Sequence, residues 1–341
     1  MGANSAGCSV WPVSCSSDKP AAMTEKGSSA HSTSSGDPKL DRRYAWAEAA
    51  FKEGDPKAAI EILDQTLAEA YGFTAAWHLY GLAQEALGHN EEAATAWRQC
   101  LVLDPADHFG ARLDLARVGA MPAEEATSEN FSGTLFDGYA DRFDSHLTEA
   151  LQYRAPALLK EALGRICALT SRSFRFETVF DLGCGTGLMG EAIRAETGFL
   201  AGCDLSPRMI ERARAKTKAD GAPLYDKLAV AGLTSFLASR PDKSADLVIA
   251  ADVFVYLGDL GAAFAQSARV LQPGGLFAFT VQSHSGEGVI VGEDRRFAHA
   301  DLWLREKLHE ARLRPLRIEE ASTRQDRDRP VPGLLVVAER G

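Results

Sequence analysis

The spacing of apolar and polar positions divides the chain into stretches of different kinds. Residues 1–39 are dominated by Ser, Gly, Ala and Thr, with too few large apolar side chains to offset the entropy of ordering them. This segment is predicted to be disordered. From Asp41 onward apolar residues recur at helical spacing, which predicts a helical module over residues 40–120. Residues 119–130 contain Pro122 in a weakly apolar stretch and are expected to form a hinge.

The second half of the chain shows alternating strand and helix patterns. Residues 131–341 begin with amphipathic segments, expected to be lid helices over 131–168, and continue with an α/β core over 174–341. Alternation of strands with helices is typical of a doubly wound, mostly parallel sheet with helices on both faces. The expected strands are residues 177–182, 198–205, 227–233, 245–252, 274–282, 314–322 and 333–340.

The helical module repeats itself at a spacing of 34 residues. Gly54 corresponds to Gly88, Ala59 to Ala93 and Leu63 to Trp97. The second copy, TAAWHLYGLAQEALGHNEEAATAWRQCLVLDP, resembles a tetratricopeptide repeat in its bulky, small and terminating residues. A partial third unit is expected over 108–119. Because so few repeats bury little core alone, the module is expected to pack against the following domain, and it offers a surface for a protein partner.

Composition and charge narrow the function classes. The 341 residues are 45% hydrophobic and 25% charged, as in ordinary globular proteins, and the formal net charge is -10. This acidic balance argues against a nucleic-acid substrate. No apolar run reaches the length of a membrane span, and the start does not resemble a secretion signal, so a cytoplasmic protein is expected. The six cysteines lack metal-ligand spacing, and no metal site is expected.

The stretch VFDLGCGTGLMGEAI, residues 179–193, carries the most chemical information. An apolar strand runs into Asp181, and the following glycines let a ligand approach the backbone ahead of a helix. Its GTGLMG portion also matches a dinucleotide pattern, which keeps an NAD-dependent oxidoreductase open. The acidic Asp181 suits a ligand with an ammonium group better than a pyrophosphate. The next strand ends in DLSPRM, with Asp204 placed to accept ribose hydroxyls.

The motifs DLGCGTG, DLSPRM, DLVIAADVFVYL and LQPGGLFAFT, in this order, resemble class I methyltransferases. The resemblance covers about residues 131–341 and implies S-adenosylmethionine as cofactor. It also places Asp181 at the methionine ammonium and Asp204 at the ribose diol. The other residues that it implies around the cofactor are Gly183, Gly185, Gly187, Leu205, Met209, Leu233, Tyr139 and Arg154. The lid segment resembles a bacterial methyltransferase subgroup with an N-terminal tetratricopeptide region.

One position departs from the pattern of this family. Many members carry an acidic residue at the end of the third strand, where it binds the adenine amino group, but this chain has Gly232 there. Either adenine recognition relies on backbone and on Leu233, or cofactor affinity is reduced. On this basis Gly232→Asp is expected to tighten cofactor binding.

Candidate catalytic groups follow the fourth strand and come from the lid. Asp252 and Tyr256 lie just past the strand, where strand ends form the ligand crevice of such sheets, and His146 lies in the lid. An oxygen or nitrogen nucleophile that starts protonated needs such a base. Further candidates are Tyr153, Gln282, His284 and His299.

The function expected from these features is methyl transfer from S-adenosylmethionine to an oxygen or nitrogen acceptor. A small-molecule acceptor is favoured over a protein acceptor that docks on the helical repeats. A non-catalytic assembly protein built on a methyltransferase scaffold is a further alternative.

Overall fold

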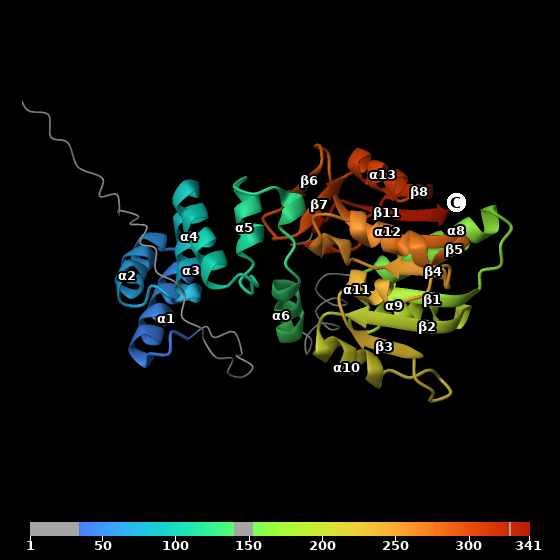
Figure 1. The fold of residues 1–341 in the computed structure, drawn as a ribbon, viewed down its shortest axis with the longest axis horizontal. Coiled ribbons are helices and arrows are strands. Elements are labelled where there is room, and N and C mark those ends of the chain that lie inside the picture. Colours follow the sequence, from blue (N-terminus) through green and yellow to red (C-terminus); the bar gives the residue numbers. More distant parts are fainter. Residues whose placement is uncertain (1–33, 140–152, 327–328) are drawn as a thin grey trace, which may run out of the picture. The chain divides into compact units, whose positions relative to one another are not determined.

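Helices open the described part of the chain, which comprises residues 34–139, 153–326 and 329–341 of the computed structural model (Figure 1). They are α1 (Pro38–Lys52), α2 (Pro56–Glu69), α3 (Thr74–Ala86), α4 (Asn90–Leu103) and α5 (Ala111–Arg117). Helix α1 begins inside the segment predicted to be disordered, which corrects that boundary. The Asp37 side chain caps it by accepting from the Lys39 N–H, and Pro38 at the first position favours helical φ.

The 34-residue spacing corresponds to two equivalent helical pairs, α1 with α2 and α3 with α4. Gly54 and Gly88 take positive φ angles of 87° and 80° in the turn of each pair. At the next equivalent position, Leu63 and Trp97 are both fully buried. Any side chain at Gly81 would collide with the Trp97 ring, so the small residue lets α3 and α4 pack closely.

The segment predicted to be a hinge, residues 119–130, packs against the α/β part instead. A short 3₁₀ helix, η1 (Ala123–Glu125), follows α5, and Ala123 and Ala126 are buried in a cluster with Val289 and Val291. Helix α6 (Glu129–Tyr139) then starts before residue 131. Apolar contacts of this segment therefore tie the helical module to the α/β part.

A mixed sheet forms the centre of the α/β part. Its main path has the order β3-β2-β1-β4-β5-β11-β8, in which β1 to β5 are parallel and β11 is antiparallel to both its neighbours. The strands are β1 (Phe176–Leu182), β2 (Thr197–Asp204), β3 (Lys227–Val230), β4 (Ala245–Ala250), β5 (Leu271–His284), β8 (Leu313–Glu320) and β11 (Gly333–Arg340). The α/β fold with a mostly parallel sheet is confirmed.

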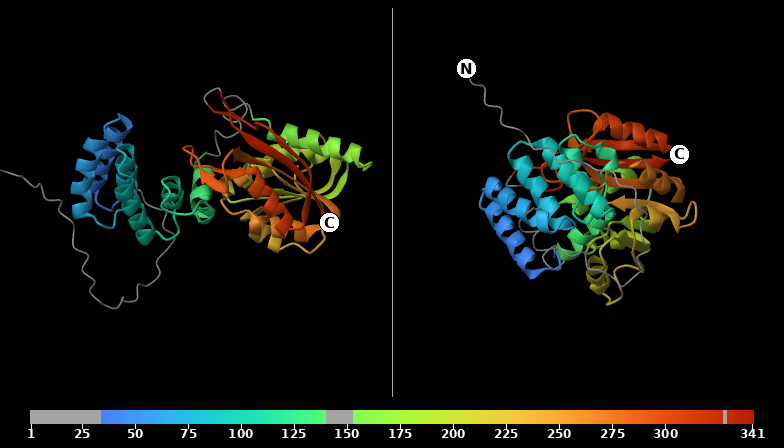
Figure 2. Two further views of the ribbon diagram at one scale, coloured as in Figure 1. Left: turned by 90° about the horizontal axis from the view of Figure 1, so that it is seen from above. Right: turned by 60° about the vertical axis from the view of Figure 1, so that its left-hand side comes forward.

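Helices cover both faces of this sheet (Figure 2). One face carries α8 (Ala155–Leu169), α9 (Leu188–Ile193) and α10 (Pro207–Ala215), packed in one buried cluster with β1 and β4. The other carries α11 (Leu233–Ala238), α12 (Gly261–Val270) and α13 (Asp301–Glu310), around a cluster of Phe rings. Because the parallel strands end at one edge, Asp181, Asp204 and Ala250 are brought together there.

The strand pattern missed some elements. β6 (Val289–Val291) pairs with β7 (Phe297–Ala300), which adds to β5 beyond Val281, and none of the predicted strands covers them. A small two-stranded sheet joins β9 (Gln325–Asp326) and β10 (Arg329–Pro330). The strand predicted over 227–233 ends at Val230, because Gly232 caps α11. In the described ranges no helix has the length and apolarity to cross a membrane.

Candidate active site

The turn between β1 and α9 needs glycine for two reasons. Gly183 and Gly187 adopt positive φ angles of 59° and 98°, which other residues rarely adopt. A Cβ atom at Gly183 would also lie 2.7 Å from Val253 in the turn after β4. The loop therefore presents bare backbone at the carboxyl edge of the sheet.

Asp181 is buried at the end of β1 and has one carboxylate oxygen free. The Tyr225 hydroxyl donates to its Oδ2 at 2.6 Å, whereas its Oδ1 has no hydrogen-bond partner within the described ranges. Burial raises the pKa of Asp181 to about 7. A buried carboxylate with a free oxygen favours a cationic partner such as a ligand ammonium. Tyr225 was not predicted, and no local pattern in its sequence marks it.

Asp204, at the end of β2, is held by backbone amides. Gly185 N–H donates to its Oδ2 and Ser206 N–H to its Oδ1, each at 2.9 Å. Each oxygen keeps a lone pair for a further donor. Burial raises the pKa of Asp204.

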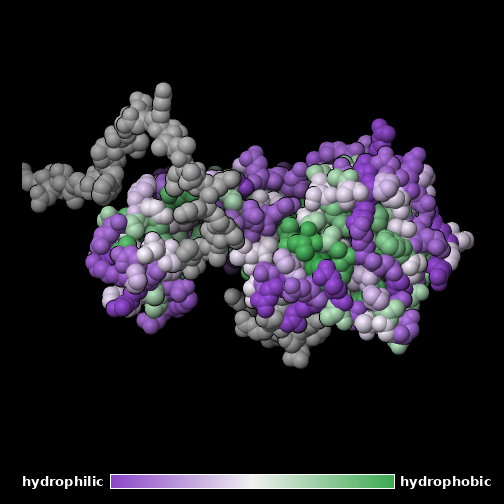
Figure 3. All heavy atoms as spheres, turned by 60° about the horizontal axis from the view of Figure 1, so that its bottom comes forward, coloured by the Kyte–Doolittle hydropathy of each residue, from purple (hydrophilic) through white to green (hydrophobic). Residues whose placement is uncertain are grey.

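A cavity of about 370 Å³ runs along these strand ends. Gly183, Gly185 and Asp204 line it together with Leu205, Met209 and Leu233, so six of the residues expected around the cofactor share one cavity. The rest of its lining comes mainly from α6, the β4–α12 segment and two arginines, namely Thr127, Glu129, Ser132, Leu135, Phe136, Tyr153, Thr234, Ala251, Asp252, Val253, Val255, Tyr256, Leu257, Arg296 and Arg324. The glycine loop and the candidate catalytic residues thus share one cavity. On the face shown in Figure 3, apolar side chains of the α/β part gather in one region bordered by hydrophilic ones.

Asp252 lies in the cavity wall and its carboxylate is fully engaged. Thr280 Oγ1 donates to Oδ1 at 2.8 Å, and Thr323 Oγ1 donates to Oδ2 at 2.8 Å. Arg324 Nη1 lies 3.4 Å from Oδ2. The backbone at Asp252 takes a φ of 56°, and its N–H donates to the Thr280 hydroxyl at 2.8 Å. These donors fix the carboxylate and stabilise its charge.

Tyr256 belongs to a polar and aromatic group at the same end of the cavity. Its ring packs edge-to-face on Phe136 of α6 at 4.9 Å between centroids, and the Arg296 guanidinium lies 5.7 Å from its centre. Tyr153 donates to the Ala251 carbonyl at 3.4 Å, and burial followed by the charge of Asp252 raises its pKa well above the ordinary value. Arg296 and Arg324 were not predicted.

The structure separates other predicted residues from the cavity. Asp181 and Gly187 do not line it, and Arg154 is exposed at the start of α8. His299 is buried and bonds the Leu257 carbonyl, and burial lowers its pKa to about 4, so it is a neutral structural residue. His146 and the side chain of Tyr139 lie outside the described parts.

The end of β3 is occupied differently from the sequence expectation. A Cβ atom at Gly232 would lie 2.6 Å from Glu129 Oε1, so a carboxylate from α6 already stands beside this glycine. Glu129 also lines the cavity. No local sequence pattern connects Glu129 with this position, because it lies 103 positions before Gly232.

Comparison with known proteins agrees with this geometry. Residues 180–279 match the family described as a methyltransferase domain. The chain is 30% identical over 128 residues to a malonyl-[acyl-carrier protein] O-methyltransferase of Serratia marcescens, covering 38% of this chain and 47% of that protein. It is 31% identical over 122 residues to aklanonic acid methyltransferase DauC of Streptomyces sp. (strain C5), covering 35% and 54%. The chain thus spans about half the length of the curated relatives it matches.

Solved structures give matches of the same kind. One is the 1,6-didemethyltoxoflavin-N1-methyltransferase of Burkholderia thailandensis with S-adenosylhomocysteine, at a TM-score of 0.45 and 15% identity, covering 62% of this chain and 88% of that one. The family match falls on the strands and glycine loop that build the cavity. Residues 180–279, which include the glycine loop and the strand ends beside the cavity, are therefore similar to a methyltransferase domain and lie in a mostly parallel α/β sheet.

Proposed function

We propose that this protein transfers a methyl group from S-adenosylmethionine to an oxygen or nitrogen atom of a small molecule that carries an anionic group. The observation that supports it is the single cavity in which the glycine loop and Asp204 meet Tyr256 and Arg296. One end of this cavity has the donors and acceptors for a nucleoside, and the other has charged and aromatic groups for an acceptor.

The cofactor end is built to hold a cation and a diol. The bound sulfonium supplies an activated methyl group, so the protein needs chiefly to align the acceptor and exclude water. Asp204 would accept hydrogen bonds from the ribose hydroxyls, and the charge of Asp181, which does not itself line the cavity, would favour the methionine ammonium from beneath the glycine loop. Gly183 leaves the backbone open to the ligand.

The acceptor end favours a nucleophile that is already ionised. Both oxygens of Asp252 already accept hydrogen bonds from threonine hydroxyls, so neighbouring side chains of the protein hold this carboxylate in place. Arg296 lines the cavity, and it makes no ion pair with any carboxylate in the described residues. Burial would lower the pKa of Arg296, but Tyr256, Asp294 and Asp252 raise it, so its charge is retained. A carboxylate or similar anion on the acceptor would pair with the Arg296 guanidinium.

A protein acceptor is the second candidate, with the helical module as a tetratricopeptide-like docking surface. Its support is the exposure of Trp46, Tyr71 and Val102, at 60%, 61% and 71%. The mostly apolar, partly enclosed cavity suits a small molecule better, and Leu135 and Phe136 of α6 form part of its wall.

Two measurements test the proposal. Calorimetry on the full chain should show binding of S-adenosylhomocysteine and none of NAD; the reverse result would overturn the cofactor assignment. Transfer of label from S-adenosylmethionine to a panel of small carboxylic acids should then be lost in Arg296→Gln and retained in Arg305→Gln, an exposed control that pairs with Asp301. Equal turnover in both variants would exclude the anion site.

A further inference from the structure

The end of strand β3 carries a carboxylate from another element of the fold. The Oε1 atom of Glu129 would lie 2.6 Å, and its Oε2 atom 3.1 Å, from a Cβ atom on Gly232. Gly232 itself has a φ of -66°, which every residue can adopt. The backbone therefore does not require glycine here, but a side chain at position 232 would force the end of the Glu129 side chain to move.

Helix α6 is fastened to the methyltransferase domain beyond Glu129. Asp137, two turns along α6, accepts a hydrogen bond from the Ser206 hydroxyl at 2.8 Å and from the Arg208 N–H at 3.2 Å. Before the helix, Thr127 Oγ1 accepts from the Gly258 N–H at 2.9 Å. With contacts on both sides, the first turn of α6 is fixed over the ends of β2 and β3.

The position of Asp204 determines where the adenine base would lie. With the ribose on Asp204 at the end of β2, the methionine portion would extend over the glycine loop toward β1 and β4. The base must then extend the other way, toward β3, where Leu205, Met209 and Leu233 form an apolar wall. Glu129 is the carboxylate at this end of the cavity lining, and it has no hydrogen bond or ion pair with any described residue.

We propose that Glu129 accepts the hydrogen bond of the adenine amino group, in place of a residue at position 232. A carboxylate accepts hydrogen bonds and cannot donate when ionised, so it selects an amino group over a carbonyl oxygen. Adenine recognition then depends on α6, which also forms the wall of the acceptor end through Phe136. This inference rests on the proposed cofactor.

The test compares two nucleosides on the full-length chain by calorimetry. S-inosylhomocysteine differs from S-adenosylhomocysteine at the purine, with a carbonyl oxygen in place of the amino group. Wild type should bind the adenosyl compound at least about tenfold more tightly, the effect of one hydrogen bond to a charged group. Glu129→Ala should lose most of this preference, and Glu125→Ala, an exposed control outside the cavity, should keep it.

A rescue experiment uses the glycine itself. Gly232→Asp alone should weaken binding, because the new side chain displaces Glu129 and places two like charges together. Gly232→Asp combined with Glu129→Ala should restore the preference for adenine to within about threefold of wild type. Thermal melts of all variants would show that the fold is retained.

Two outcomes separate the inference from the proposed function. If wild type binds S-adenosylhomocysteine and Glu129→Ala keeps the full preference for it, the assignment of Glu129 is wrong while the cofactor stands. If wild type binds neither nucleoside, the proposed function itself fails. Tighter binding by Gly232→Asp alone would also overturn the role of Glu129.

Discussion

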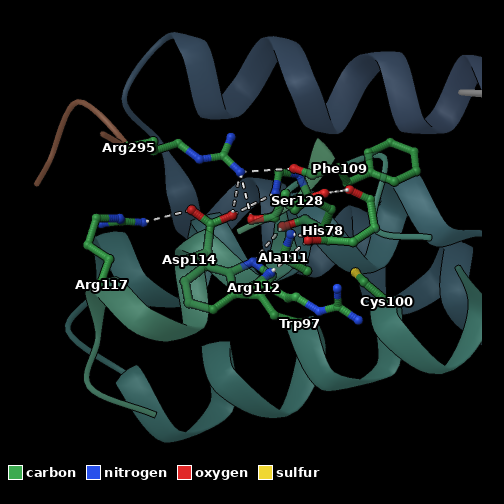
Figure 4. Close-up of polar contacts among 12 residues, drawn as sticks. His78, Trp97, Cys100, Phe109, Ala111, Arg112, Asp114, Arg117, Ser128 and Arg295 are labelled. Atoms are coloured by element: carbon green, nitrogen blue, oxygen red, sulfur yellow. Dashed lines mark hydrogen bonds and ion pairs between the residues drawn. The ribbon is translucent and has the colours of Figure 1, made fainter. Parts of the chain in front are cut away.

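Removal of the Asp114 carboxylate should destabilise the protein by an amount that the structure allows to be estimated. Asp114 lies in α5, and its side chain is fully buried. Its Oδ2 is 2.9 Å from His78 Nε2 and 3.0 Å from Arg295 Nη2, and its Oδ1 is 3.3 Å from Arg117 Nη2 (Figure 4). Because Arg295 comes from the loop between β6 and β7, this cluster joins the helical module to the sheet.

The expected loss follows from the burial of the partners. Removing one member of a buried ion pair typically costs about 3–5 kcal/mol, because the other charge is left buried and unpaired. Here Arg295 and Arg117 keep 26% and 18% side-chain exposure, and Arg295 still donates to the Phe109 and Gly110 carbonyls. The lower end, about 3 kcal/mol, is therefore expected for Asp114→Ala. In a domain of this size it corresponds to a fall in melting temperature of roughly 6–12 °C.

Urea unfolding of wild type and Asp114→Ala measures this difference. Glu48→Ala is the matched control, since its pair with Lys52 is exposed and should contribute less than about 1 kcal/mol. Burial alone would raise the pKa of Asp114, but the His78 hydrogen bond and the charges of Arg295 and Arg117 lower it overall. The stabilisation is thus present above the unfolded pKa and is lost as pH falls below about 3.8 toward the folded value. A difference below 1 kcal/mol at pH 7 would refute the role of this cluster.

Three other outcomes are expected. Asp204→Ala should weaken S-adenosylhomocysteine binding by about 2–3 kcal/mol in calorimetry, and an unchanged affinity would place the ribose elsewhere. Because the pKa of Asp181 is raised to about 7, affinity for the cofactor ammonium should rise roughly tenfold from pH 6 to pH 8, and Asp181→Asn should be insensitive over this range. Deleting residues 1–120 exposes the apolar surface around Val289 and Val291, so the fragment should have a lower melting temperature or aggregate. A fragment as stable as the full chain would show that the helical module does not stabilise the α/β part.

The sheet was predictable because its signals are local. β1, β4 and β11 are buried over most of their length and appear in the sequence as apolar runs that end in turn residues. β6 and β7 have three and four residues, too few for any periodicity to show. They form because β7 adds to the end of β5, and this pairing is set by the tertiary fold.

The cavity-lining residues at strand ends could be placed from the sequence for a similar reason, and the others could not. Asp204 directly ends a strand, so its position follows from the strand. Tyr225 reaches Asp181 from 44 residues away, and Arg296 reaches the cavity from a loop after an unpredicted strand. Such residues are placed by packing, which a single sequence does not display. Gly232 was the exception, because glycine at a position that is often acidic drew attention to the end of β3, where the Glu129 carboxylate lies nearby.

Arg295 and Arg296 are consecutive residues, but one side chain contacts the helical module and the other lines the cavity. Arg295 donates to Asp114 and to carbonyls of the helical module, and Arg296 lines the acceptor end of the cavity. A shift of the module therefore moves the loop that carries Arg296, whereas Asp204 is held at the end of β2 by its own amides. Asp114→Ala is thus expected to lower kcat/KM for the acceptor at least about fivefold while changing affinity for S-adenosylhomocysteine less than about twofold. Equal losses in both would mean that the module supports the whole domain rather than the acceptor end.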